Sequence, residues 1–542
     1  MAAFPGIARR LAANAARVGR RTALRGLVPG NAWLLVRLGP GTGDQRPPAI
    51  SFGKGPRLGL FDALRVLEAA AEDDRLDGVL LRFHGGLPGW SAALALRRAV
   101  ERLREVGKPV VAWGESLGAQ EYLVASAASR VWLPESGSLY LVGLRLEQFF
   151  LRDLLAHLDI EPEVVRVGSY KTAGELLTRG GMSPEQREQL EGWIDDLFGE
   201  LVEGISRGRG LSPDDVRERI DEGPYPARLA VERGLLDDCL YPDEIPAALA
   251  PLAAVPATGR DGPRRAQLVE AEAYLAHAAD AGWQPLWRDL PRMAYVVASG
   301  AIHRGSGARG GITSDGFREL LDGLGRERAV RGVVLRVDSP GGDAVASDLL
   351  FRAVSRLSRE KPVVVSMGDV AASGGYYLAS AADSVFAEAG TLTGSIGVVG
   401  GKLNLEGLYR RLGIAKDAIE RGARAGLQSE VRAFTPDERS AVKREMEALY
   451  ATFVARVAEG RALSVETVRR LAQGRVWSGA RARSHGLIDA IGGPLDAMRE
   501  ARRRAGIGER ERVLVEFHPR RSRWLDLRSL LASSARARVR VI

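Results

Sequence analysis

The sequence predicts an α/β protein in which one parallel βαβ domain occurs twice. Short runs of β-branched residues alternate with amphipathic helical stretches, which is typical of parallel βαβ units. The pattern recurs at a constant offset, since Gly78 and Gly332 are 254 residues apart and so are Gly168 and Gly422. A chain of 542 residues also exceeds one ordinary hydrophobic core. We therefore expect two homologous domains in tandem.

The second copy has the clearest succession of elements. We expect, in order, a buried strand at 333–337, a helix capped by Asp343 and running to about 359, a strand at 362–366, a helix from 374 onward and a strand at 384–387. The first copy repeats this order, and its end, Gly234-Leu-Leu-Asp237, matches Gly486-Leu-Ile-Asp489 of the second. The similarity therefore extends over whole domains.

Composition shifts divide the chain into five parts. We expect a basic arm at 1–31, a first domain at 32–245, a connector at 246–290, a second domain at 291–508 and a basic tail at 509–542. The connector contains a stretch rich in Ala, Pro and Gly, followed by a helical stretch. The single cysteine, Cys239, excludes an intrachain disulfide, so the fold does not depend on an oxidising compartment.

The net charge of +9 reflects mainly arginines near the two ends of the chain. Ile7, Leu11 and Val18 fall on one helical face, opposite several arginines. This pattern is typical of an amphipathic helix that lies on an anionic membrane surface. A poorly ordered basic arm explains the same residues equally well. No recognition motif supports nucleic-acid binding. No stretch reaches the roughly 18 to 20 apolar residues of a membrane span, and no secretory signal is recognisable.

A serine in the second copy has the setting of a nucleophile. Ser373 lies in Ala-Ala-Ser-Gly-Gly, between a predicted strand and a predicted helix. Such a junction exposes a hydroxyl, small neighbours admit a substrate backbone, and the helix N-terminus favours an oxyanion. A glycine-rich turn with an ordinary serine is the alternative. In the register of the duplication, Ala119 stands at this position in the first copy.

A lysine in the first copy completes the pattern. Lys171 lies in Val-Gly-Ser-Tyr-Lys-Thr-Ala-Gly, and Ala425 faces it in the second copy. A buried lysine can act as a base because desolvation lowers its pKa. The six histidines offer no convincing alternative base, and His485 lies in a surface-like helix end. Each copy thus keeps one half of a Ser/Lys pair, which predicts a composite site.

These residues resemble a known family. The segments Arg336-Val-Asp-Ser-Pro-Gly-Gly342, Ala371-Ala-Ser-Gly-Gly-Tyr-Tyr377 and Thr391-Leu-Thr-Gly-Ser-Ile-Gly397 resemble signal peptide peptidase A, or protease IV. Tyr170-Lys171 and Met182-Ser-Pro in the first copy are similar to the tandem-duplicated long form of that family. The resemblance covers nearly all of residues 32–508.

The resemblance implies two tandem ClpP/crotonase-like βαβ-superhelix domains and a Ser/Lys dyad endopeptidase without metal or cofactor. Ser373 would be the nucleophile and Lys171 the general base, unless another lysine such as Lys416 substitutes. Gly342, preferred over Gly341, and Gly374 would form the oxyanion hole. Ser395 would orient the lysine, although a structural capping role for this serine is nearly as plausible. The first-copy turn, His84-Gly-Gly-Leu-Pro-Gly, departs from the pattern, as expected of a copy without an oxyanion hole.

The expected substrates are peptides such as residual signal peptides, and the resemblance implies a ring-like homotetramer. Long-form members begin with a membrane-spanning helix that this sequence lacks. We therefore expect a protein of the bacterial cell that is either peripheral at the inner membrane, on an anionic lipid surface, or soluble. Two other functions fit the sequence: a catalytically inactive peptide-binding scaffold and a crotonase-like hydrolase of thioesters.

Overall fold

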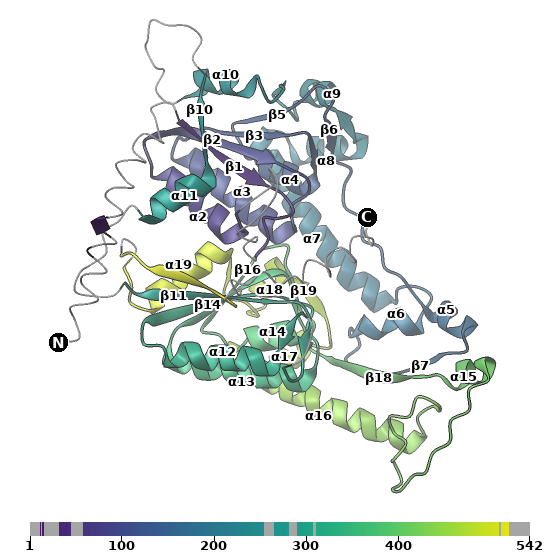
Figure 1. The fold of residues 1–542 in the computed structure, drawn as a ribbon. Helices are drawn as coiled ribbons and strands as arrows, with labels where there is room; N and C mark the ends of the chain where they lie inside the picture. Colours follow the sequence, from purple (N-terminus) through teal and green to yellow (C-terminus); the bar gives the residue numbers. More distant parts are fainter. Residues whose placement is uncertain are drawn as a thin grey trace, which may run out of the picture.

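The computed structural model describes residues 11, 14–15, 32–44, 58–253, 265–280, 290–306, 310–508 and 511–519. Two α/β bodies lie one above the other in Figure 1, and an arm built from both copies extends to one side. Almost all of the basic arm at 1–31, and residues 520–542 of the tail, lie outside the described residues. None of the helices in the described ranges combines the length and apolar character needed to cross a bilayer.

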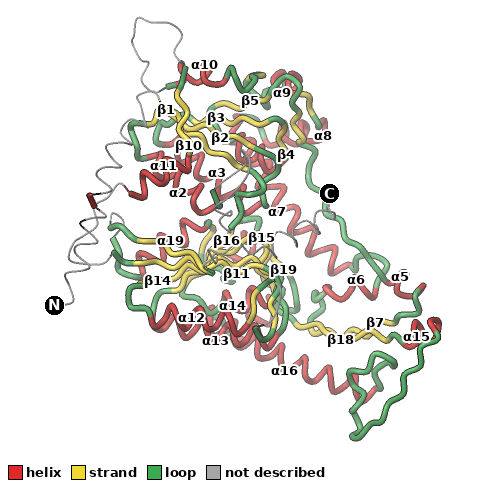
Figure 2. Tube along the Cα trace, viewed as in Figure 1, coloured by secondary structure: helices red, strands yellow, loops and turns green. Residues whose placement is uncertain are grey.

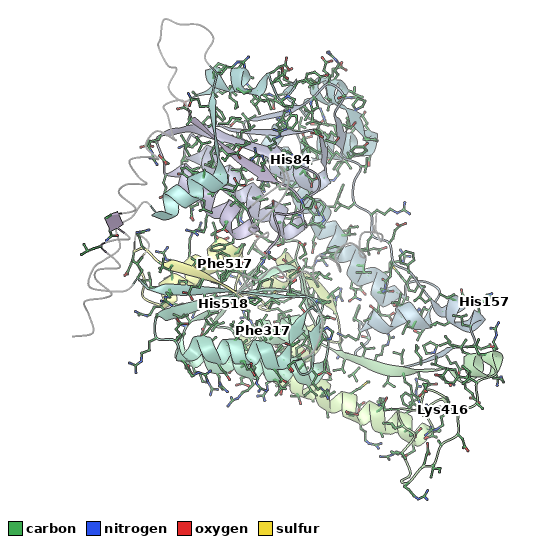
Figure 3. The ribbon with its side chains drawn as sticks, in the orientation of Figure 1. His84, His157, Phe317, Lys416, Phe517 and His518 are labelled. Carbon is green, nitrogen blue, oxygen red and sulfur yellow. The ribbon has the colours of Figure 1, made fainter. Side chains whose placement is uncertain are left out.

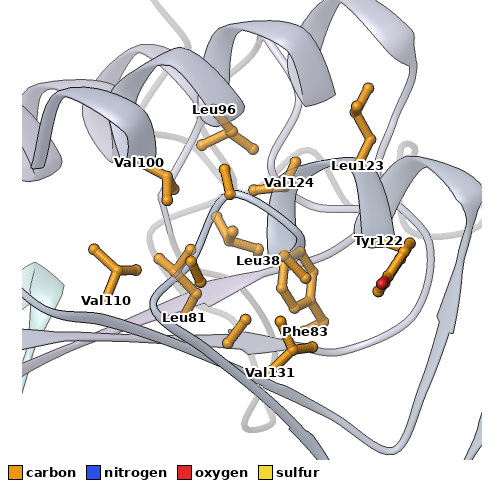
Figure 4. Packing of buried hydrophobic residues seen from close by; sticks show 14 of the residues in the cluster. Leu38, Leu81, Phe83, Leu96, Val100, Val110, Tyr122, Leu123, Val124 and Val131 are labelled. Atoms are coloured by element: carbon orange, nitrogen blue, oxygen red, sulfur yellow. The ribbon is translucent and has the colours of Figure 1, made fainter. Parts of the chain in front are cut away.

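The first body is built on a sheet whose neighbouring strands are all parallel. Its strands, in spatial order, are β10 (Gln267–Glu270), β1 (Ala32–Leu38), β2 (Leu76–Phe83), β3 (Val110–Gly114), β5 (Arg130–Leu133) and β9 (Asp238–Cys239). Helices α2 (Leu60–Ala71), α3 (Trp90–Glu105) and α4 (Ala119–Ala125) pack on it. Phe83 and Leu81 of β2 meet Leu96 and Val100 of α3 in the core (Figure 4). Fully buried parallel strands explain the continuous apolar runs of this sequence.

The second body repeats the arrangement. Its sheet follows the order β19 (Val476–Ser478), β17 (Leu392–Gly394), β15 (Val363–Ala372), β14 (Val330–Ser339), β11 (Arg292–Ser299) and β21 (Leu514–His518), and β16 (Ser384–Ala387) joins β15 to β20 (Ala490–Ile491). Within the described part of the chain, β17 and β19 are the only neighbours in this sheet that run antiparallel, and the other pairs are parallel. Helix α19 (Pro494–Arg504) covers the sheet face toward the first body, and α12 (Ser314–Arg326), α13 (Ala344–Glu360) and α14 (Gly374–Ala379) cover the other (Figure 2).

The elements expected in the second copy are confirmed. The strands and helices predicted between 333 and 387 correspond to β14, α13, β15, α14 and β16. The Asp343 carboxylate accepts a hydrogen bond of 2.8 Å from the Ala346 backbone N–H and so caps α13 as predicted.

The sheets extend beyond the expected domain boundaries. Strand β10, inside the expected connector 246–290, pairs with β1, and α11 (Ala271–Asp280) contacts α2. Strand β21, inside the expected tail 509–542, pairs with β11. Strand β10 covers the edge of β1, and β21 covers the edge of β11. Without them these edges would expose unpaired backbone groups. Their short, partly charged sequences carry little periodic signal, which explains why composition assigned them to linkers.

An arm interlocks the two copies. Strand β7 (Glu161–Val167) of the first copy pairs antiparallel with β18 (Val398–Asn404) of the second over their full lengths. The arm also contains α5 (Arg152–His157), α6 (Glu175–Thr178) and α15 (Glu406–Leu412), and two 26-residue helices lead back from it, α7 (Pro184–Arg209) and α16 (Pro436–Arg461). Each long helix begins with proline after a capping Ser183 or Thr435, a further trace of the duplication.

Short elements complete the structure. They are β4 (Ser116–Gly118), β6 (Ser138–Tyr140), η1 (Thr172–Gly174), α8 (Pro213–Glu222), β8 (Tyr225–Pro226), α9 (Ala227–Glu232), α10 (Ile245–Leu249), η2 (Ala250–Leu252), β12 (Ile302–His303), β13 (Ile312–Thr313), α17 (Val465–Leu471) and α18 (Gly479–Ser484).

Buried ion pairs fix how the bodies dock. Arg98 of α3 binds the carboxylate of Glu388, which is fully buried in the second body. Arg336 of β14, also buried, reaches back to Asp44 at 2.8 Å and to the Ser91 hydroxyl at 2.8 Å. Breaking such a pair leaves an uncompensated buried charge, so these contacts favour one relative orientation of the copies.

Candidate active site

Ser373 lies where β15 passes into α14, as the strand-turn-helix pattern predicted. Its backbone has φ 54° and ψ −119°, a conformation that residues with a side chain rarely adopt and that the surrounding contacts must hold. The Ser373 N–H donates to the Gly394 carbonyl of β17 at 2.8 Å, and its carbonyl accepts from Tyr377 N–H at 2.8 Å. A Cβ at Gly341 would lie 2.8 Å from that of Ser373, so the adjacent turn requires glycine.

Lys171 enters the same place from the first copy. It follows β7 and precedes η1, and its Nζ lies 3.0 Å from Ser373 Oγ. Only 5% of the lysine is exposed, and burial lowers its pKa from 10.5 to about 8. A substantial fraction of the amine can therefore be neutral near physiological pH.

The lysine loop packs against a turn of the second copy that sequence reasoning missed. Tyr170 N–H donates to the Gln473 carbonyl at 2.8 Å. A Cβ at Gly474 would come within 2.5 Å of Lys171 N, Cα and Cβ, and Gly474 has a positive φ of 78°. Glycine is needed there for both reasons. The sequence contains Gln473-Gly474 directly after a helical stretch, and this dipeptide by itself indicates only a turn.

Ser395 contacts the lysine ammonium through two atoms. Its Oγ and its backbone carbonyl each accept a hydrogen bond from Lys171 Nζ at 2.9 Å. The residue follows β17, has a positive φ of 54°, and donates its own N–H to the Arg475 carbonyl at 2.7 Å. The three bonds from Nζ thus run to Ser373 and Ser395, which fixes the direction of the amine.

Gly342 and Gly374 border the serine from two sides. Gly374 is the first residue of α14, where a backbone N–H has no partner within the helix. The turn at Gly342 is held by bonds of its neighbours, from Ile302 N–H to the Gly341 carbonyl and from Asp343 N–H to the Ile302 carbonyl. Gly341 N–H itself donates to Ser339 Oγ at 3.2 Å. Because the Gly341 N–H is already used in this bond, the Gly342 N–H is the better candidate to donate to an oxyanion together with Gly374 N–H.

A cavity of about 690 Å³ opens from these residues. Helices α13, α14 and α16 and strand β18 form its walls. Its volume lies within the range of binding sites for small ligands or peptide side chains. The apolar side chains of the lining are those of Ala173, Pro340, Ala344, Val345, Val398, Val399, Leu449 and Phe453.

At the corresponding place in the first copy, a carboxylate binds the backbone. Ala119 begins α4, where Ser373 precedes α14 in the second copy. The buried Glu121 accepts hydrogen bonds from Gly118 N–H at 2.9 Å and from Leu87 N–H in the divergent turn. In the register of the duplication, Pro88 of this turn stands where the second copy has Gly342, and a proline has no backbone N–H to donate.

The remaining candidates lie elsewhere. Lys416 forms an ion pair of 2.5 Å with Glu430 at the far end of the arm, and His157 lies there too (Figure 3). Ala425, opposite Lys171 in the register of the duplication, is exposed in the same arm. The His485 ring packs edge-on against Trp477.

Comparison with known proteins adds the family context. The profile of Peptidase family S49 matches residues 102–256 and 355–508, one match in each copy. "Serine protease SPPA, chloroplastic" of Arabidopsis thaliana is 34% identical over 472 residues, which cover 86% of this chain and 68% of that protein. "Protease 4" of Haemophilus influenzae is 30% identical over 82% of this chain and 73% of its own length. "Protease 4" of Salmonella typhi is 31% identical over 82% and 71%, respectively.

Proposed function

The chain belongs to peptidase family S49, in its duplicated form, and we propose that it is a serine endopeptidase whose Ser/Lys dyad is divided between its two copies. The observation that carries this proposal is the 3.0 Å hydrogen bond between Lys171 Nζ and Ser373 Oγ. We also propose that each copy has the ClpP/crotonase-like superhelix, which the parallel order of both sheets supports.

The proposed reaction begins with proton transfer. Neutral Lys171 takes the Ser373 hydroxyl proton while Oγ bonds to the carbonyl carbon of the peptide. Negative charge then develops on the carbonyl oxygen, where the N–H groups of Gly342 and Gly374 would donate to it. The C–N bond breaks as Lys171 returns the proton to the leaving amine, and an acyl-enzyme remains.

Water completes the cycle by the same route. Lys171 removes a proton from water as the water oxygen attacks the acyl carbon, and the bond to Ser373 Oγ breaks with return of that proton to the serine. Ser395 supports both steps because its two acceptors hold Nζ toward Ser373. Such fixed orientation of a base contributes much of its effect on the rate.

The proposed substrates are peptides, including remnants of signal peptides. The apolar wall of the cavity supports side chains of that character beside the scissile bond. We further propose a homotetramer. Exposed apolar side chains on the arm, with Phe149 at 77% and Ile419 at 91%, support self-association there. Light scattering of the full chain tests this assembly, and a monomeric mass would contradict it.

Peripheral binding to an anionic membrane surface is also proposed from the basic first 31 residues, most of which lie outside the described part of the chain. Sedimentation with vesicles of phosphatidylglycerol, compared with phosphatidylcholine, tests this interaction. Binding that is equal for the two lipids, or absent for both, would contradict it.

Hydrolysis by wild type and Ser373→Ala decides between the proposed function and its alternatives. We expect wild type to cleave an unfolded peptide and to react with a fluorophosphonate probe, and Ser373→Ala to do neither. A wild type that leaves peptides intact but hydrolyses a thioester would indicate the crotonase-like hydrolase. A wild-type protein that binds peptides but cleaves neither the peptide nor the thioester would indicate the inactive scaffold.

A further inference from the structure

A buried side chain, Gln189, links the loop that carries Lys171 to the second copy, in addition to the bond from Tyr170 N–H to the Gln473 carbonyl. Gln189 lies on α7 of the first copy and is 5% exposed. Its Nε2 donates to Thr172 Oγ1 at 2.9 Å and to the Tyr170 carbonyl at 3.3 Å, so it holds the residues on both sides of Lys171. Its Oε1 accepts from Val476 N–H of β19 at 3.0 Å.

The strand that Gln189 binds leads directly to the nucleophile. Val476 of β19 is paired with Gly394 of β17, and the Gly394 carbonyl accepts the N–H of Ser373. The residue before Val476, Arg475, accepts the N–H of Ser395. The Gln189 carboxamide therefore joins the Lys171 loop to β19. Strand β19 in turn pairs with β17, and the two together bind the backbone of Ser373 and Ser395.

The chemistry of the site requires an amide. A carboxamide offers two N–H donors to the lysine loop and one acceptor to the strand on a single planar group. A leucine of similar size would take from the Val476 N–H its acceptor and from Thr172 Oγ1 its amide donor, while the Tyr170 carbonyl would keep only the bond from Thr172 N–H. A glutamate would keep the acceptor but bring a negative charge beside the lysine loop, whose outer side already carries the ion pair of Glu188 with Arg475.

We infer that Gln189 is a positioning residue of the proposed dyad, which sets the reach of Lys171 to Ser373 by fixing the lysine loop to β19. This inference rests on the proposed function. A displacement of the base by about 1 Å can lower the rate by about 100-fold. Peptide binding should change little, because the cavity lining does not include Gln189.

Helix α7 supplies a matched control. Gln186 lies one turn before Gln189, is 3% exposed, and donates from Nε2 to Gln148 at 2.8 Å, away from the lysine loop. Gln189→Leu and Gln186→Leu therefore remove buried amide contacts from the same helix. Full-length variants are compared by melting temperature and by kcat and KM for one peptide between pH 6 and pH 10.

We expect Gln189→Leu to lower kcat by about 10- to 100-fold with KM within about twofold of wild type, and Gln186→Leu to keep kcat within about threefold. Gln189→Glu, which preserves the side-chain shape, should fold if Gln189→Leu does not. It should move the ascending limb of kcat to higher pH by roughly one unit, since a nearby carboxylate favours the ammonium form.

Two results would overturn the inference. One is wild-type kcat with an unshifted pH profile in a folded Gln189→Leu or Gln189→Glu variant. The other is an equal loss of kcat in Gln186→Leu, which would indicate a general effect of helix stability. A wild type without peptide hydrolysis would instead reject the proposed function, and the positioning role with it.

Discussion

The pH dependence of hydrolysis should report the burial of Lys171. Burial lowers the pKa of this lysine from 10.5 to about 8. At pH 7, a pKa of 8 leaves about 9% of the amine neutral, whereas a pKa of 10.5 would leave about 0.03%. The enclosure of the lysine therefore increases the population of the reactive form about 300-fold at that pH. The shift corresponds to about 3 kcal/mol of differential stabilisation of the neutral amine.

The assay is kcat/KM for a neutral peptide between pH 5.5 and pH 10. We expect one ascending limb of unit slope with a midpoint near pH 8, because deprotonation of Lys171 activates the free enzyme. The cause of the shift is desolvation and not a neighbouring charge, so the midpoint should move little between low and high salt. A rate that is flat from pH 6 to pH 9, or a midpoint above pH 10, would refute this reasoning.

Two substitutions probe the surroundings of the dyad, and a third probes Asp369 of β15, a carboxylate that binds the backbone of the first copy. Ser395→Ala should lower kcat about tenfold, because the Lys171 amine loses one of its two orienting acceptors. Gly474→Ala should lower kcat at least about 100-fold, because its Cβ would meet the Lys171 backbone at 2.5 Å. Asp369→Asn should raise the melting temperature above pH 6, because burial raises the pKa of this half-buried carboxyl from 3.8 to about 6 and its ionised form opposes folding.

Each of the three has its own contrary result. For Ser395→Ala it is an unchanged kcat across the pH range, and for Gly474→Ala it is wild-type activity in a folded variant. For Asp369→Asn, the stabilisation should grow from about pH 4 to pH 6 and level off at up to about 3 kcal/mol. A stabilisation that is the same at every pH would contradict the effect of ionisation, since Asn can still accept the bond that Ser91 N–H donates to the carboxylate at 2.6 Å.

Local rules predicted the elements around the nucleophile well. Asp343, at the start of a helical pattern after Pro-Gly-Gly, indicated the cap of α13, and the structure contains that cap. The small residues around Ser373 indicated a tight strand-turn-helix junction, and its positive φ agrees with that indication. In both places the controlling interactions are formed within a few residues, so the sequence pattern contains them.

Contacts between the copies were not visible in the same way. The duplication predicted that the copies meet, but the pairing of β7 with β18 depends on two segments more than 200 residues apart. Gln189 showed no signal because a glutamine on a long helix is usually solvated. The edge strands β10 and β21 were missed because their few residues lack a distinctive period. Tertiary packing determines these features, and no local preference encodes them.

Hydrolysis by Lys171→Ala tests the divided dyad most directly. The assay compares this variant with Lys416→Ala, which removes a lysine at the far end of the arm, in the full chain at pH 8.5. The divided dyad predicts that Lys171→Ala loses at least about 1,000-fold in kcat while Lys416→Ala keeps wild-type activity. Near-full activity of a folded Lys171→Ala variant would contradict it.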